Sequence, residues 1–123
     1  HPTAIKTTLS GLRAKVGSEK IIALIEPRSN TMRLGIHQDN LTQATEDADS
    51  VIWFQPPNID WSLEPIIKNS PVPAKVLRSI EDVVNDIIAN AKSGTHVVVM
   101  SNGGFGGVHQ KIVAALQAKN SQQ

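Results

Sequence analysis

The sequence contains no cysteine. A disulfide scaffold, a thiolate metal site and a cysteine nucleophile are therefore excluded for this chain, and the absence fits a reducing compartment. No apolar run approaches the ~20 residues that cross a membrane, and the first residues, HPTAIKTTLSG, lack the apolar core of a signal peptide. We therefore expect a cytoplasmic protein without a membrane partner.

An excess of positive charge is also missing, because 12 basic side chains face 11 acidic ones. No basic run or aromatic-interleaved stripe interrupts this balance, so the electrostatic footprint of a nucleic-acid-binding protein is absent. The four histidines form neither an HxxxH nor an HExxH pattern. We expect no nucleic-acid partner and no metal ligands in this chain.

Three continuous apolar runs, at residues 20–26, 50–54 and 96–100, indicate buried strands. Runs without polar alternation are typical of a parallel sheet that is covered on both faces. A weaker candidate strand spans residues 74–77. The sequence thus predicts a four-stranded sheet that is mostly parallel.

Helical patterns lie between and around these strands. Residues 80–91 carry an apolar stripe at the helical period, with Ser79 and Asp82 arranged as a capping box before it. Pro2 and Gly17 bound an amphipathic helix at the start of the chain, and another helix follows residue 107. Shorter helices are predicted at about 38–47 and 62–68.

The alternation of helices and strands predicts a Rossmann-like α/β fold, a single domain with helices on both faces of the sheet. We expect the domain to span residues 1–120 and residues 121–123 to form a frayed tail. A helix that begins at Pro2 leaves no preceding strand or loop, so we expect the chain to be part of a longer protein.

The loops after the strands are the candidate binding segments, since ligands of open α/β sheets sit beyond the carboxyl ends of the strands. Arg28 and Arg33 follow the first strand, and the guanidinium group suits a carboxylate or phosphate. The glycine loop SNGGFGG, residues 101–107, offers backbone amides beside a helix amino terminus, which also suits an anion. The alternatives are a solvated surface arginine and a glycine loop that serves only as a tight turn.

The stretches HPTAIKTTLSGLR, IEPRSNTMRLG and VVVMSNGGFGGVHQK resemble the carboxyl-terminal domain of the Mur ligases, most closely the ligases that add a murein tripeptide. The resemblance covers residues 1–117. It implies an ATP-dependent ligase that joins L-Ala-γ-D-Glu-meso-diaminopimelate to UDP-N-acetylmuramate through an acyl phosphate in peptidoglycan recycling. ATP and Mg²⁺ would be bound mainly by the central domain of the ligase. This chain lacks both that central domain and the amino-terminal domain.

The resemblance also implies roles for particular residues. His1 matches the end of the family's HHPT segment, which reaches toward ATP at the domain junction, and Arg28 matches an arginine near the phosphate and incoming substrate. The remaining substrate-binding candidates beside these are Ser29, Asn30, Thr31, Arg33, Ser101, Asn102, Gly103, Gly104 and Phe105.

The chain departs from the family pattern in two respects. It contains no GxxxxGK[ST] phosphate loop, so we expect no catalytic residue and no ligation from this chain alone. It also lacks the DNPR motif by which the diaminopimelate-adding family member recognises that amino acid. The sequence therefore does not identify which residues recognise diaminopimelate. The alternative functions are a sister ligase that adds L-alanine or another amine, and a Rossmann-like binding module without chemistry.

Overall fold

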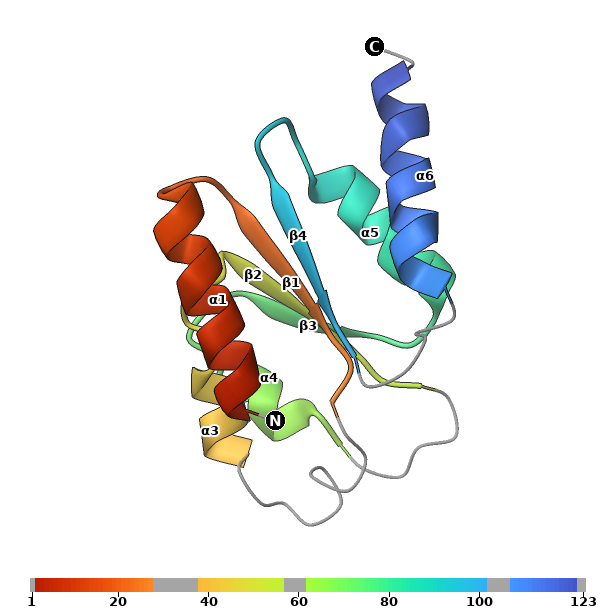
Figure 1. Ribbon diagram of the computed structural model, residues 1–123. Helices are drawn as coiled ribbons and strands as arrows, with labels where there is room; N and C mark the ends of the chain where they lie inside the picture. The colour runs from red at the N-terminus through yellow and green to blue at the C-terminus, as the bar shows by residue number, and fades with distance from the viewer. Residues whose placement is uncertain (1, 28–37, 57–61, 102–106, 122–123) are drawn as a thin grey trace.

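Helices and strands alternate along the chain in the computed structural model, which describes residues 2–27, 38–56, 62–101 and 107–121 (Figure 1). The elements, in chain order, are α1 (Pro2–Val16), β1 (Ile21–Ile25), α3 (Gln38–Gln43), β2 (Ser50–Phe54), α4 (Glu64–Lys68), β3 (Ala74–Leu77), α5 (Ile80–Asn90), β4 (His96–Met100) and α6 (Val108–Ser121).

The four strands form one parallel sheet in the order β3-β2-β1-β4. In the central strand β1, Ile25 lies opposite Trp53 of β2 and Met100 of β4. All five residues of β1 are buried, which explains its unbroken apolar sequence. The predicted Rossmann-like α/β fold is confirmed.

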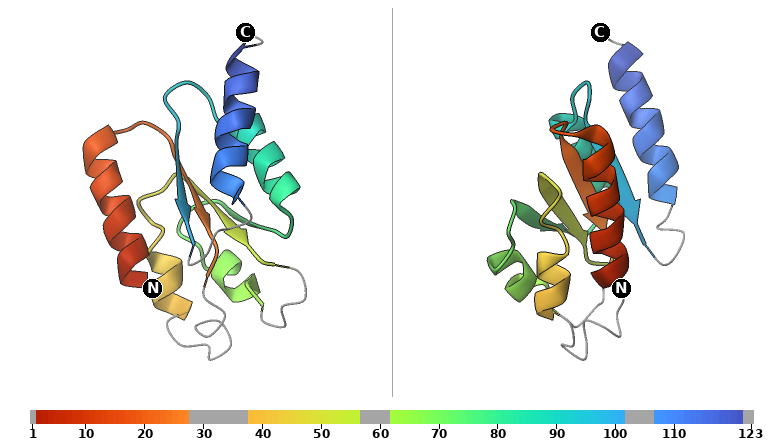
Figure 2. Two further views of the ribbon diagram at one scale, coloured as in Figure 1. Left: turned by 45° about the vertical axis from the view of Figure 1, so that its right-hand side comes forward. Right: turned by 60° about the vertical axis from the view of Figure 1, so that its left-hand side comes forward.

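Helices cover both faces of the sheet and create two separate cores (Figures 1 and 2). Because successive side chains of a strand point to opposite faces, Ile21, Ala23 and Ile25 enter one core while Ile22 and Leu24 enter the other. The first core includes residues of α1, α3 and α4, and the second includes residues of α5 and α6.

Local signals set most helix ends as the sequence predicts. The Ser79 hydroxyl accepts a hydrogen bond from the Asp82 backbone N–H at 3.0 Å and caps α5. The first helix ends before Gly17, whose positive φ of 66° is a conformation that glycine adopts without strain.

Two short helices differ from the predicted ranges. The helix predicted at 38–47 ends at Gln43, and turns follow in which the Thr45 hydroxyl donates to the Thr42 carbonyl at 2.9 Å. Such local side-chain bonds compete with continuation of a helix. The helix predicted at 62–68 begins at Glu64. Ser62 lies before the helix, and its hydroxyl accepts a hydrogen bond from the Glu64 backbone N–H at 3.1 Å.

No helix among the described residues has the length and apolar character needed to cross a membrane.

Candidate functional site

The topology marks one place on the sheet where a ligand is expected. The connections from β1 to β2 and from β2 to β3 run through α3 and α4 on one face, while the connection from β3 to β4 runs through α5 on the other (Figure 1). The winding therefore reverses between β1 and β4. In open α/β sheets, ligands bind beyond the carboxyl ends of the strands at such a switch point.

Glu26 and Ser101 lie at this switch point, each directly after its strand. The Ser101 hydroxyl donates a hydrogen bond to Glu26 Oε1 at 2.9 Å, and the Glu26 backbone N–H donates to the Met100 carbonyl at 3.0 Å. Both side chains are partly buried. A carboxylate and a hydroxyl are thus held in a defined position where the chain leaves β1 and β4.

Of the residues predicted to form the site, the structure describes Ser101, and it places this residue at the expected edge of the sheet. The other predicted site residues lie outside the described part of the chain: His1, Arg28, Ser29, Asn30, Thr31, Arg33, Asn102, Gly103, Gly104 and Phe105. Their roles stay predictions.

Glu26 is a candidate site residue that the sequence interpretation did not single out. The sequence contains a pattern that could have indicated Glu26: an acidic residue directly after five buried apolar residues. A carboxylate at the end of a covered strand needs a hydrogen-bond partner. Gln55 occupies the equivalent position after β2 and is only 4% exposed, and its backbone N–H donates to the Leu77 carbonyl at 3.0 Å. The carboxyl edge of the sheet therefore carries polar groups in defined positions after β1, β2 and β4.

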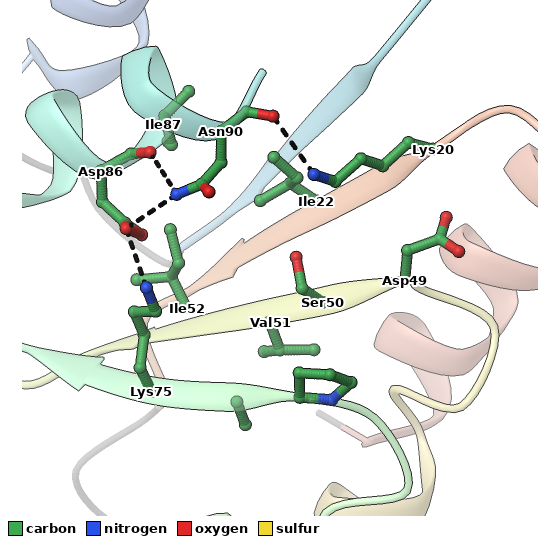
Figure 3. Close-up of a pocket in the computed structure, with 12 residues that line it drawn as sticks. Lys20, Ile22, Asp49, Ser50, Val51, Ile52, Lys75, Asp86, Ile87 and Asn90 are labelled. Atoms are coloured by element: carbon green, nitrogen blue, oxygen red, sulfur yellow. Dashed lines mark hydrogen bonds and ion pairs between the residues drawn. The ribbon is translucent and has the colours of Figure 1, made fainter. Parts of the chain in front are cut away.

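A pocket of about 360 Å³ lies at the opposite, amino-terminal edge, between α5 and the first residues of β2 and β3 (Figure 3). Lys75 Nζ lies 2.8 Å from Asp86 Oδ1, and Lys20 Nζ donates to the Asn90 carbonyl at 3.1 Å. These lysines link the sheet to α5. We assign the pocket a packing role, because its cations are engaged by α5 and it lies far along the strands from Glu26 and Ser101.

The described residues contain no group of three or more histidine, aspartate or glutamate side chains that could hold a metal ion. We derive no step through a metal from the described part of the chain.

Comparison with known proteins identifies several relatives, although no protein-family model matches the chain. The chain is 43% identical over 120 residues to the UDP-N-acetylmuramate–L-alanyl-gamma-D-glutamyl-meso-2,6-diaminoheptandioate ligase of Escherichia coli (strain K12), a match that covers 97% of this chain and 26% of that protein. The curated relatives of this name are thus about four times as long as the matched segment, since it spans 26% of their length.

Two crystal structures are similar in both fold and sequence. A murein peptide ligase from Psychrobacter arcticus 273-4 matches with a TM-score of 0.85 and 44% identity, over 94% of this chain and 25% of that one. A domain attributed to a UDP-N-acetylmuramate:L-alanyl-gamma-D-glutamyl-meso-diaminopimelate ligase of Haemophilus ducreyi 35000HP matches with a TM-score of 0.78 and 39% identity, over 94% of this chain and 84% of that domain.

A ligase named for L-alanine is a more distant relative. The UDP-N-acetylmuramate–L-alanine ligase of Symbiobacterium thermophilum is 25% identical over 130 residues, which covers 97% of this chain and 27% of that protein. Sequence similarity is therefore substantially higher to the proteins named as tripeptide ligases than to this one.

Proposed function

We propose a function from one premise: the chain belongs to the Mur ligase family, among the UDP-N-acetylmuramate–tripeptide ligases. It is the carboxyl-terminal domain of an ATP-dependent enzyme that joins L-Ala-γ-D-Glu-meso-diaminopimelate to UDP-N-acetylmuramate in peptidoglycan recycling. The observation that carries this proposal is the 43% identity along nearly the whole chain to a ligase of that name.

The proposed reaction makes one amide bond. ATP, bound with Mg²⁺ mainly by the central domain, supplies the phosphoryl group that activates the UDP-N-acetylmuramate carboxylate as an acyl phosphate. The tripeptide amine then attacks the acyl carbon, the carbon–oxygen bond to phosphate breaks, and the attacking nitrogen loses a proton. The products are the amide, ADP and phosphate. A ligase that consumes ATP and a UDP-sugar belongs in the cytoplasm, where these substrates are found.

The contribution of this domain is to hold the incoming peptide and to keep water from the acyl phosphate. The Glu26–Ser101 pair supports the start of both binding segments, because its 2.9 Å hydrogen bond joins the residues that follow β1 and β4. Arg28, Ser29, Asn30, Thr31 and Arg33 are the proposed contacts after β1. Asn102, Gly103, Gly104 and Phe105 are those after β4, and His1 is the proposed contact at the ATP-side junction.

The test is ADP release by the full-length enzyme with UDP-N-acetylmuramate and, in turn, the tripeptide, meso-diaminopimelate and L-alanine. We expect turnover with the tripeptide only. Turnover with L-alanine in place of the tripeptide would overturn the specificity and favour a sister ligase. An absence of ADP release with every donor would overturn the enzymatic function and favour a binding module.

Variants of the full-length enzyme test the proposed site. Arg28→Ala is expected to lower kcat/KM for the tripeptide by about 100-fold, the effect of losing a charge-assisted contact in a closed site. Ser101→Ala is expected to lower it by about 10-fold, because the hydrogen bond that joins the starts of the two binding segments through Glu26 is lost. Unchanged kinetics in either variant would remove that residue from the site.

A further inference from the structure

The two outer strands of the sheet differ in how their open edges are protected. Strand β3 contains Lys75, whose side chain is 51% exposed, and Pro73 lies directly before it. Charges and prolines keep an outer strand from pairing with another chain. Strand β4 has neither, because its sequence is HVVVM and its polar residue, His96, lies at the first position and contacts Glu19. It also pairs with β1 without a bulge, so β4 is an unprotected edge.

The outer side of β4 carries backbone groups that can pair with another strand. No described strand pairs with this side, which faces the viewer in Figure 1 between α1 and α6. On the inner side, the His96 N–H donates to the Lys20 carbonyl at 2.8 Å. The N–H and C=O of one residue point to the same side of a strand, and successive residues alternate. The N–H and C=O groups of Val97 and Val99 therefore point outward.

We propose that β4 pairs with β4 of a second copy of this chain, antiparallel and about a two-fold axis through Val98. In this register Val97 of each copy lies opposite Val99 of the other, and each outward N–H meets a carbonyl. The strand is complementary to itself, since it offers donors and acceptors in equal number and its valines bring no charge into the contact. The two sheets thereby become one continuous sheet.

Helix α6 carries an apolar side chain that borders this open edge. Ile112 is buried against the sheet, and Lys119 reaches the carboxyl end of α5. With 3.6 residues per turn, Val113 lies about 100° around α6 from Ile112, on the side away from Lys119. The Lys75–Asp86 ion pair ties α5 to β3, so this side of α6 is the one toward the open edge of β4. Val113 is 41% exposed, the one large apolar side chain among the described residues with such exposure.

The spacing of strands and helices fits a partner that carries its own α6. Val108 and Ile112 of α6 share a core with residues of β1, and valines of β4 pack against the same core, so the helix covers both strands. Because strands lie about 4.8 Å apart, two α6 helices related by the two-fold axis would have axes about 10 Å apart. Packed helices have axes about 8–10 Å apart. Val113 of each copy would therefore be covered by α6 of the other.

These features favour a second copy over an isolated strand as the occupant of the edge. A lone extended peptide would pair with the backbone of β4 but would leave Val113 exposed, whereas a second copy covers both. The two-fold axis is perpendicular to the sheet, so the two carboxyl edges, each with its Glu26–Ser101 pair, point in opposite directions. Pairing thus leaves both candidate sites open, and the inference does not depend on the proposed function.

Sedimentation velocity of the full-length protein over a concentration series tests the assembly. We expect a monomer–dimer equilibrium. Val113→Lys is expected to raise the dissociation constant at least about 10-fold, because two ammonium groups replace an apolar contact at the two-fold axis. Ala114→Lys is the matched control, since Ala114 is exposed on the side of α6 that points away from the sheet, and it should leave the dissociation constant unchanged.

Hydrogen exchange of the β4 amides tests the strand pairing itself and needs no substitution. The Val97 and Val99 amides should exchange rapidly at concentrations where the protein is monomeric and slowly where it is dimeric. The Val98 amide points toward β1 and should exchange slowly at both concentrations.

Each alternative gives a different result. A protein that is monomeric at every concentration would overturn the proposal. Slow exchange of Val97 and Val99 in the monomer would also overturn it, because another part of the longer protein would then cover the edge. A dimer in which these two amides still exchange rapidly would use another surface, and a dimer unaffected by Val113→Lys would overturn the contact between the α6 helices.

Discussion

At the scale of single residues, Arg13 of α1 binds several distant parts of the chain through its guanidinium group. Its guanidinium group donates to the Gly17 and Glu19 carbonyls, both at 2.8 Å, and to the Asp47 carbonyl at 3.0 Å. It also lies 2.8 Å from Asp49 Oδ2, which accepts the first backbone N–H of β1 at 2.7 Å. One side chain thus joins the end of α1, the start of β1 and the turn before β2.

This arrangement makes the stability of the chain depend on pH. The hydrogen bond from Arg13 lowers the pKa of Asp49 below its ordinary value of 3.8, against a smaller opposing effect of burial. A carboxylate with a lowered pKa in the folded state stabilises the fold fully above its unfolded pKa, near pH 4, and loses that contribution as the pH falls through the folded value. We expect Asp49→Asn to reduce the loss of stability between about pH 4 and pH 2.

Urea unfolding midpoints of the parent chain and Asp49→Asn across that range measure the effect, with Glu46→Gln, exposed in the turn after α3, as the control. The effect will be small, because the Asp49 side chain is 44% exposed and solvent screens the pair. If the urea midpoints of Asp49→Asn and of the parent chain change equally with pH, Asp49 is not the source of the pH dependence.

At the scale of elements, lysines from other parts of the chain bind the carboxyl-terminal end of α5. The helix has no basic residue in its last turn. Lys119 of α6 donates to the Ile88 carbonyl and, at 2.9 Å, to the Ala91 carbonyl, while Lys20 donates to the Asn90 carbonyl at 3.1 Å. Cations at this end of a helix satisfy free carbonyls and complement the helix dipole.

Removing the Lys119 ammonium group should therefore destabilise α5 from its carboxyl end. We expect Lys119→Met to lower the free energy of unfolding by about 1 kcal/mol, because hydrogen bonds from a charged donor to the helix end are lost. The last turn of α5 should exchange its amide hydrogens faster. Lys111→Met, on the exposed side of the same helix α6, is the control; equal losses of stability in the two variants would rule out a specific role for Lys119.

The helices and strands themselves could largely be predicted from the sequence. Continuous apolar runs identified β1, β2 and β4, and Ser79 and Gly17 identified helix ends, because these are local signals. The length of α3 was predicted wrongly, since the hydrogen bond of Thr45 to the Thr42 carbonyl is not visible as a break in the apolar pattern.

At the scale of the whole molecule, the sheet separates two cores, and among the described residues no side chain belongs to both. Ile5 of α1 belongs to one core, and Ile87 of α5 belongs to the other. The sheet lies between α1 and α5 (Figure 2), so described side chains of these two helices pack in different cores. Mutations in the two cores should therefore act independently.

A double-mutant cycle tests this independence. Ile5→Val and Ile87→Val should each lower the free energy of unfolding by about 0.5–1.5 kcal/mol, and the double variant should equal their sum within about 0.5 kcal/mol. The matched cycle within one core pairs Ile87→Val with Ile112→Val of α6, where coupling is expected because both residues belong to the same cluster. Strong coupling between Ile5 and Ile87 would show that the sheet transmits packing changes between its faces.

The candidate site was predictable only in part. The rule that ligands bind beyond parallel strands made Ser101 a candidate, and the structure places it at the carboxyl edge of the sheet, but the Glu26–Ser101 hydrogen bond could not be foreseen. Glu26 and Ser101 are 75 positions apart in sequence, and no local pattern pairs them. Such contacts follow from strand order, which a single sequence does not encode in its local periodicity.

The sequence by itself determined the kind and order of the elements, because apolar periodicity, capping residues and glycines act over a few neighbouring positions. Its longer motifs also determined the family, since they are specific enough to be matched without a structure. Only the tertiary structure decided that β1 lies between β2 and β4, that Lys119 and Lys20 bind the carboxyl end of α5, and that the Ser101 hydroxyl meets Glu26. These features depend on groups that are distant along the chain and meet only when the two cores form around the sheet.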